Sequence, residues 1–255
     1  LAESLPNTWQ PFGRTLLPDI GLSASVRDKL QLADGGEYGY NIAALYSNGW
    51  SYESQRLLSY IGDGTGGLGV SSDYTVDRTS RDADIGFLFD LAYEPDAFRS
   101  LEATTLVIHA TDGATQQLGG LYVDDSVDLG RTEISWVQQL LLSQSIQSTR
   151  VLPNLNGGER NFRYSFGWAR RYEPDSRYVS YWDETADGDF EAENQVLSPR
   201  QYAAGRFWTS VNDFLNDAQL SWTFPIDFGG SGTNFMDVGV YGLYQIRFAD
   251  TRRFI

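Results

Sequence analysis

The feature that most constrains the fold of this chain is the alternation of apolar side chains with small or polar ones over long stretches. Rows of this kind begin near Ile20, Tyr38, Ile85, Ile134, Phe162, Leu220 and Val238. Because successive side chains of a strand point to opposite faces, each row gives one apolar face and one small or polar face. Helical spacing is not sustained anywhere, and its best candidate is a short stretch at residues 203–214. The sequence therefore predicts an all-β protein with about eight long strands.

Strand length and connection length separate a barrel from a sandwich. The rows at residues 133–147 and 237–248 are longer than the roughly 5–6 residues of most soluble strands. Short connections at residues 94–100 and 228–234 alternate with long polar ones, which we expect near 60–72, 112–131 and 173–213. Short turns at one rim and long loops at the other are typical of an outer-membrane barrel. We therefore expect residues 1–255 to form one region of antiparallel transmembrane β-barrel strands, located in a bacterial outer membrane and in contact with its lipid.

Composition excludes several classes of protein. The chain has no cysteine, so disulfide scaffolds, Cys-ligated zinc sites and thiol nucleophiles cannot occur. With 34 acids against 19 bases, its net charge of -15 would repel a phosphate backbone, and we expect no nucleic-acid partner. No apolar run approaches the ~20 residues of a membrane-spanning helix, whereas a barrel strand needs only ~9–11 alternating residues.

Several stretches resemble a known family. Residues 38–51 (YGYNIAALYSNGWS) and 82–109 (DADIGFLFDLAYEPDAFRSLEATTLVIH) are similar to early barrel strands of TonB-dependent outer-membrane receptors. Residues 160–173 (RNFRYSFGWARRYE) and the closing Arg252-Arg253-Phe254 resemble that family as well. The resemblance implies energy-coupled uptake of a small ligand, a glycan or a metal chelate, together with an energy-transducing periplasmic protein.

Two hallmarks of that family have no counterpart in this sequence. It contains no plug domain with an energy-coupling box, and it stops at residues 250–255 (DTRRFI) without a terminal aromatic strand. About eight strands could close into a small barrel or form an arc of a larger one, and the missing terminal aromatic strand favours the arc. The resemblance then implies a piece of a longer receptor or a chain that needs partners.

The expected loop at residues 173–213 carries the candidate ligand-binding side chains. They are aromatic rings that could stack on a sugar or a chelate, namely Tyr178, Tyr181, Trp182, Phe190 and Trp208. The alternative is that these rings pack the loop onto itself. Acids in the same loop, Asp183, Asp187 and Asp189, are candidate calcium ligands, although their spacing does not match an EF-hand and they could simply be solvated.

His109 is the only histidine, so any Ser-His-acid mechanism would have to use it. No motif nominates a serine partner, and we predict that the protein is not an enzyme and needs no cofactor. Two other hypotheses stay open. One is a secreted or surface β-sandwich that binds carbohydrate, and the other is an outer-membrane hydrolase that uses His109.

Overall fold

The computed structural model is built from strands alone. It describes residues 9, 11, 13, 15–16, 18–33, 35–62, 64, 66–122, 127–153, 157–183, 195–200, 202–226 and 234–254. The strands are β1 (Ile20–Gln31), β2 (Glu37–Gly62), β3 (Leu68–Asp96), β4 (Arg99–Tyr122), β5 (Val127–Leu152), β6 (Gly158–Asp183), β7 (Gln195–Leu197), β8 (Ala204–Ile226) and β9 (Asn234–Phe254). The described residues form no helix that is long and apolar enough to cross a membrane. The all-β prediction is confirmed.

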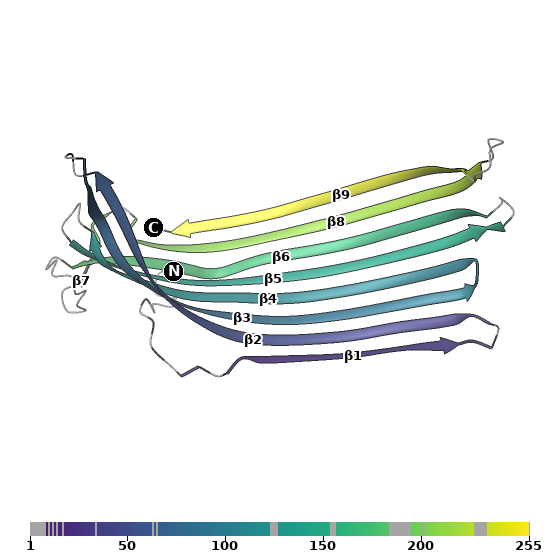
Figure 1. The fold of residues 1–255 in the computed structure, drawn as a ribbon, viewed down its shortest axis with the longest axis horizontal. Helices are drawn as coiled ribbons and strands as arrows, with labels where there is room; N and C mark the ends of the chain where they lie inside the picture. Colours follow the sequence, from purple (N-terminus) through teal and green to yellow (C-terminus); the bar gives the residue numbers. More distant parts are fainter. Residues whose placement is uncertain are drawn as a thin grey trace.

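All strands belong to one antiparallel sheet, which is not closed. Its order is β1-β2-β3-β4-β5-β6-β8-β9, and the three-residue β7 pairs with β6 (Figure 1). Eight of the strands are long, from 12 residues in β1 to 29 in β3, as the sequence predicts. Each long strand is hydrogen-bonded to its neighbour in the chain, so β1 and β9 form the two edges, and they run in opposite directions (Figure 1).

The connection between β3 and β4 is a tight turn, as the sequence predicts for residues 94–100. The Asp96 carboxylate accepts hydrogen bonds from the Arg99 Nε (2.8 Å) and from the Phe98 backbone N–H (2.9 Å). These two donors hold the pKa of Asp96 below its ordinary value, and the hydrogen bond from Arg99 has the larger effect. An aspartate that binds the backbone two residues on is a common turn-forming device.

Directly paired residues of neighbouring strands point to the same side, so the register gathers most of the alternating apolar side chains on one side of the sheet. The side that we call the apolar face carries the rows that begin at Tyr38, Ile85, Leu101, Phe162 and Val238. The opposite side, which we call the polar face, carries the intervening small and polar residues, such as Asn41, Ser47, Asp84, Asp90, Ser143, Ser145, Arg163 and Arg247. It also carries some apolar residues, such as Leu45, Ile108, Leu141, Leu215 and Leu243. The alternation in the sequence thus becomes one sheet surface that is mainly apolar and one that is mainly small and polar.

The long connections predicted at 60–72, 112–131 and 173–213 are wrong in extent. The strands continue far into these stretches, which leaves only 63–67, 123–126 and 184–203 between the long strands. Polar cross-strand pairs hold the extensions together: Arg56 Nε donates to Asp73 (2.7 Å), and the Tyr52 hydroxyl donates to Asp77 (2.7 Å). Because these extensions lack an apolar row, their sequence is typical of a loop. The short stretch at residues 203–214, which is the best candidate for helical spacing, is not a helix: β8 begins at Ala204 and runs through it. We call these extensions, away from the short turns, the outer arm.

A β-bulge separates the outer arm of β6 from the rest of that strand. The pairing with β8 shifts between Glu173 and Ser176, and the pairing with β5 shifts at the same place. One extra residue in a strand reverses which side its following side chains face. Even-numbered side chains of β6 therefore lie on the apolar face before the bulge and on the polar face after it.

Gly120 offers a sharp test of the outer β3–β4 pairing. Its φ is +145°, and a Cβ atom built there would lie 2.1 Å from the Asp73 carbonyl oxygen. We expect Gly120→Ala to push the two strands apart and to cost more than about 1 kcal/mol. The neighbouring Gly119→Ala is the matched control, since its Cβ would meet nothing within 4 Å. Hydrogen exchange at Tyr74 should rise only in the Gly120 variant, and equal protection in both would contradict this packing.

Candidate functional site

The predicted aromatic ligand site is divided between the two faces of the outer arm. Tyr178 and Trp182 lie in β6 beyond the bulge, on the polar face, whereas Tyr181 lies between them on the opposite side. Trp208 also lies on the apolar side, where its ring meets Phe254 edge-on at 5.1 Å. Phe190 lies outside the described residues. The sheet thus brings Tyr178 and Trp182 to one surface and keeps Tyr181 and Trp208 away from it.

Tyr178 belongs to a continuous row of side chains that crosses four strands. Its ring lies 4.4 Å from the Arg131 guanidinium carbon on β5 and 5.8 Å from the Phe207 ring on β8. The Arg253 guanidinium on β9 lies 5.0 Å from the Phe207 ring and donates to the Tyr178 hydroxyl at 3.3 Å. We call Arg131, Tyr178, Phe207 and Arg253 the arginine–aromatic row. Its members share the polar face in the register and contact one another in order.

A glycine makes room for this row. A Cβ atom at Gly205, which pairs directly with Tyr178, would lie 2.9 Å from the tyrosine ring. The ring therefore lies flat across the backbone of β8 and is only 8% exposed. Beside it, Tyr202 is 54% exposed, and its ring lies 5.5 Å from the Arg253 guanidinium.

A hollow on the other side of the outer arm includes Tyr181. Its volume is about 450 Å³, and its lining includes Pro11, Thr75, Gln117 and Thr132. Pro11 precedes β1, so a segment from the start of the chain borders this surface. The hollow brings no second predicted ligand residue to Tyr181.

Of the three candidate calcium ligands, Asp183 is the one that the structure describes. It is fully buried at the end of β6 and pairs directly with Asp128 of β5, which is buried as well. Asp187 and Asp189 lie outside the described residues. In the part of the chain that the structure describes, no three carboxylate or histidine side chains gather in a way that could hold a metal ion. Calcium binding stays a prediction.

His109 lies on the apolar face of β4, between Ile85 of β3 and Leu140 of β5. It borders a hollow of about 70 Å³ together with Gln138, Arg170 and Tyr172. No serine is among the residues that line this hollow. The geometry lends the hydrolase hypothesis no support.

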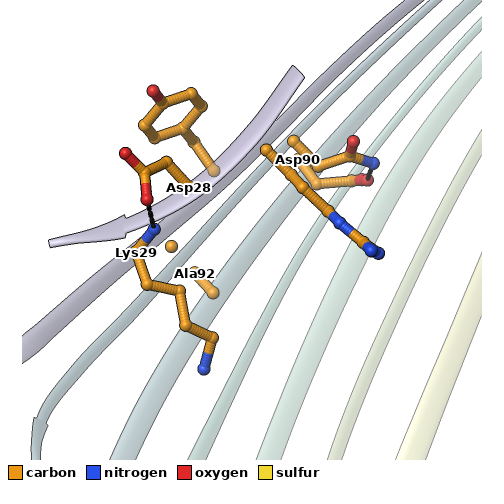
Figure 2. A pocket seen from close by; sticks show the side chains of 8 residues that line it. Asp28, Lys29, Asp90 and Ala92 are labelled. Carbon is orange, nitrogen blue, oxygen red and sulfur yellow. Dashed lines mark hydrogen bonds between the residues drawn. The ribbon is translucent and has the colours of Figure 1, made fainter. Parts of the chain in front are cut away.

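Another hollow lies at the free β1 edge, on the polar face (Figure 2). It measures about 590 Å³, and its lining includes Arg27, Lys29 and Asp90. Asp90 accepts a hydrogen bond from Asn41 (3.0 Å), and the Lys29 ammonium forms an ion pair with Glu37 (2.5 Å). Figure 2 shows Lys29, Asp90 and Ala92 along its wall. Lys29 and Asp90 already have partners, so we assign this hollow no reactive role.

Sequence reasoning identified Tyr178 but missed Arg131 and Arg253. The two arginines are 122 positions apart, and only the order β5-β6-β8-β9 brings them to the same ring. Because of the bulge after Glu173, alternation in the sequence does not show which β6 side chains share a face. The one available signal is Pro174, a residue that interrupts strand pairing and often marks a bulge.

Comparison with known proteins assigns no family to these residues. The strands, faces and side chains themselves must therefore carry the functional argument. No protein-family model matches the chain, and no curated protein matches it in sequence.

Proposed function

We propose that this chain supplies strands to the wall of a bacterial outer-membrane β-barrel that takes up a small ligand. The observation that carries the proposal is the exposed apolar face of a single open sheet. Large side chains on that face stand free of any protein cover: Leu22 is 66% exposed, Ile85 55% and Val240 64%. Lipid is a cover that suits this chemistry.

The total surface supports this reading. The accessible area is 17035 Å², whereas a folded water-soluble protein of 28.5 kDa exposes about 11,000 Å². Exposed apolar patches of a few hundred Å² already mark interaction sites on soluble proteins. A sheet with so much uncovered surface needs a membrane or a partner to be stable.

The apolar rows have the length of a membrane crossing. The windows at residues 38–46 and 85–93 carry apolar side chains at every second position on the same face. A tilted barrel strand needs ~9–11 such residues to cross the hydrocarbon layer. The strands then continue beyond these windows into the polar outer arm.

Two polar side chains on the apolar face have partners there. The Tyr164 hydroxyl donates to Asn216 (2.9 Å), and the Trp168 indole N–H donates to Asn212 (3.4 Å). In hydrocarbon an unsatisfied polar group costs several kcal/mol, so this pairing suits a lipid-facing wall.

The polar face suits a wet interior. Ser47 donates to Asp84 (3.2 Å), and Arg247 forms two hydrogen bonds to Asp213, each of 2.7 Å. Small residues such as Gly39 and Gly167 alternate with these groups on the same surface. A polar interior opposite an apolar exterior is the arrangement of transmembrane barrels.

The free edges of the sheet, β1 and β9, indicate that further strands complete the proposed barrel. Unpaired strand edges do not occur within the hydrocarbon layer, so β1 and β9 must both find partners. Because they run in opposite directions, they can close with an even number of further antiparallel strands between them. This agrees with the prediction of an arc within a larger barrel.

Uptake of a glycan or metal chelate with an energy-transducing partner rests on the resemblance of the sequence to TonB-dependent receptors. The β-sandwich alternative is less well supported, since it requires a second sheet over the apolar face. The nine described strands all belong to a single sheet.

Single cysteines test the proposal directly, because the chain has none of its own. Leu142 and Ser143 lie at the same depth of β5 on opposite faces, and Ile146 and Ser145 repeat the pair. After refolding into lipid vesicles, we expect a water-soluble maleimide to label Ser143→Cys and Ser145→Cys. Fluorophores at Leu142→Cys and Ile146→Cys should be quenched by brominated lipid. Equal quenching at all four positions would contradict the proposed wall.

A further inference from the structure

We propose that the outer arm holds a binding site for a small ligand that carries a carboxylate on a sugar ring, built around Arg253 of the arginine–aromatic row. The inference rests on the proposed function, since it names the ligand chemistry of the same inner surface. Nothing in the predicted aromatic set alone points to a charged ligand.

The first argument is the charge environment of Arg253. The chain has 34 acids for 19 bases, and most described arginines with a close partner pair with a carboxylate, as Arg56 does with Asp73. Arg131 in the same row also contacts one, Glu133, at 3.3 Å. Within the residues that the structure describes, Arg253 forms no ion pair, although it is exposed.

The second argument is that the Arg253 guanidinium is already held in place. It lies 5.0 Å from the Phe207 ring and 5.5 Å from the Tyr202 ring, and it donates to the Tyr178 hydroxyl. The planar guanidinium fork matches a carboxylate with two parallel hydrogen bonds, and a fixed fork loses less entropy on binding.

The third argument is the surface beside the cation. The Tyr202 ring is 54% exposed next to Arg253 and offers an aromatic face on which a sugar ring can stack. The Arg131 guanidinium stacks on the far side of the row, where it also contacts Glu133. A ring with one carboxylate uses both the stacking surface and the cation.

Glucuronate and glucose make the matched probes, because they share a pyranose ring and differ in one carboxylate. We expect the full chain in neutral detergent, titrated by calorimetry, to bind glucuronate at least tenfold more tightly than glucose. Arg253→Gln should weaken glucuronate binding about tenfold, the scale of one charge-assisted hydrogen-bonded contact. Tyr178→Phe, which keeps the ring and removes the hydroxyl that positions Arg253, should weaken it by about threefold.

Arg252→Gln is the control, because this substitution removes the same charge from the opposite face of the sheet. Arg252 pairs there with Asp250 at 3.2 Å. Equal binding of the two sugars, or an equal loss in the Arg252 and Arg253 variants, would overturn the site. The titration needs no bilayer, so its failure would leave the lipid labelling of β5 unaffected. Conversely, failure of the labelling would not remove a difference between glucuronate and glucose.

Discussion

Leu142→Arg should destabilise the protein in a bilayer by about 2–4 kcal/mol, the cost of an arginine on the lipid face of a barrel near the membrane centre. Leu142 lies on the apolar face of β5 between Val107 of β4 and Trp168 of β6. The guanidinium would have to remain in hydrocarbon or pull water and lipid headgroups toward it. Urea unfolding from lipid vesicles measures the loss.

Ser143→Arg provides the control at the same depth. Ser143 lies on the polar face, next to Gly167 of β6, where an arginine can extend into water. We expect this variant to stay within about 1 kcal/mol of the unchanged protein. If both substitutions cost the same, the two faces of the sheet do not differ in the way that the proposed wall requires.

Asp175→Asn should destabilise the protein by about 1.5–3 kcal/mol, because Asp175 is a carboxylate that two largely buried arginines share. It accepts a hydrogen bond from Arg177 at 2.6 Å and lies 3.8 Å from Arg206, whose side chains are 11% and 8% exposed. The bulge after Glu173 brings Asp175 to this position between β6 and β8. An amide would remove the negative charge that Arg177 and Arg206 share across this pair of strands.

Glu173→Gln is the matched control for Asp175→Asn, two positions earlier in β6. Glu173 lies 3.9 Å from Arg171, whose side chain is 56% exposed. Such solvent-exposed pairs contribute about 0–1 kcal/mol. Thermal unfolding in detergent should therefore separate the two variants clearly, and similar losses would mean that the buried triad is not a stabilising feature.

The sequence predicts the fold where burial and periodicity agree. At Tyr38–Tyr46 and in the row from Ile85, each strand alternates strictly, and the structure gives the expected strand and face. The strands of the outer arm cannot be predicted in this way, because polar pairs join them, such as Arg56 with Asp73 and Tyr52 with Asp77. Polar residues that pair across strands look the same in sequence as polar residues of a loop.

The candidate site was predicted less well than the fold. Tyr178 was identified from its aromatic ring, but its partners Arg131 and Arg253 come from strands that only the sheet order brings together. Tyr181 and Trp208 were grouped with it because they are near in sequence, although the register turns them to the opposite side. Alternation within one strand shows which of its side chains share a face. Which side chains of four strands meet at a site depends also on the register between the strands and on the bulge in β6.

The central claim is that lipid covers the apolar face, and its most direct test is whether the folded chain depends on an amphiphile. Sedimentation velocity with circular dichroism, in detergent or lipid and in plain buffer, measures this dependence. We expect a monodisperse β-rich species only when detergent or lipid is present, and aggregation when it is removed, because side chains such as Leu22, Val240 and Tyr244 lose their cover. A monodisperse, stably folded chain in plain buffer would contradict the account.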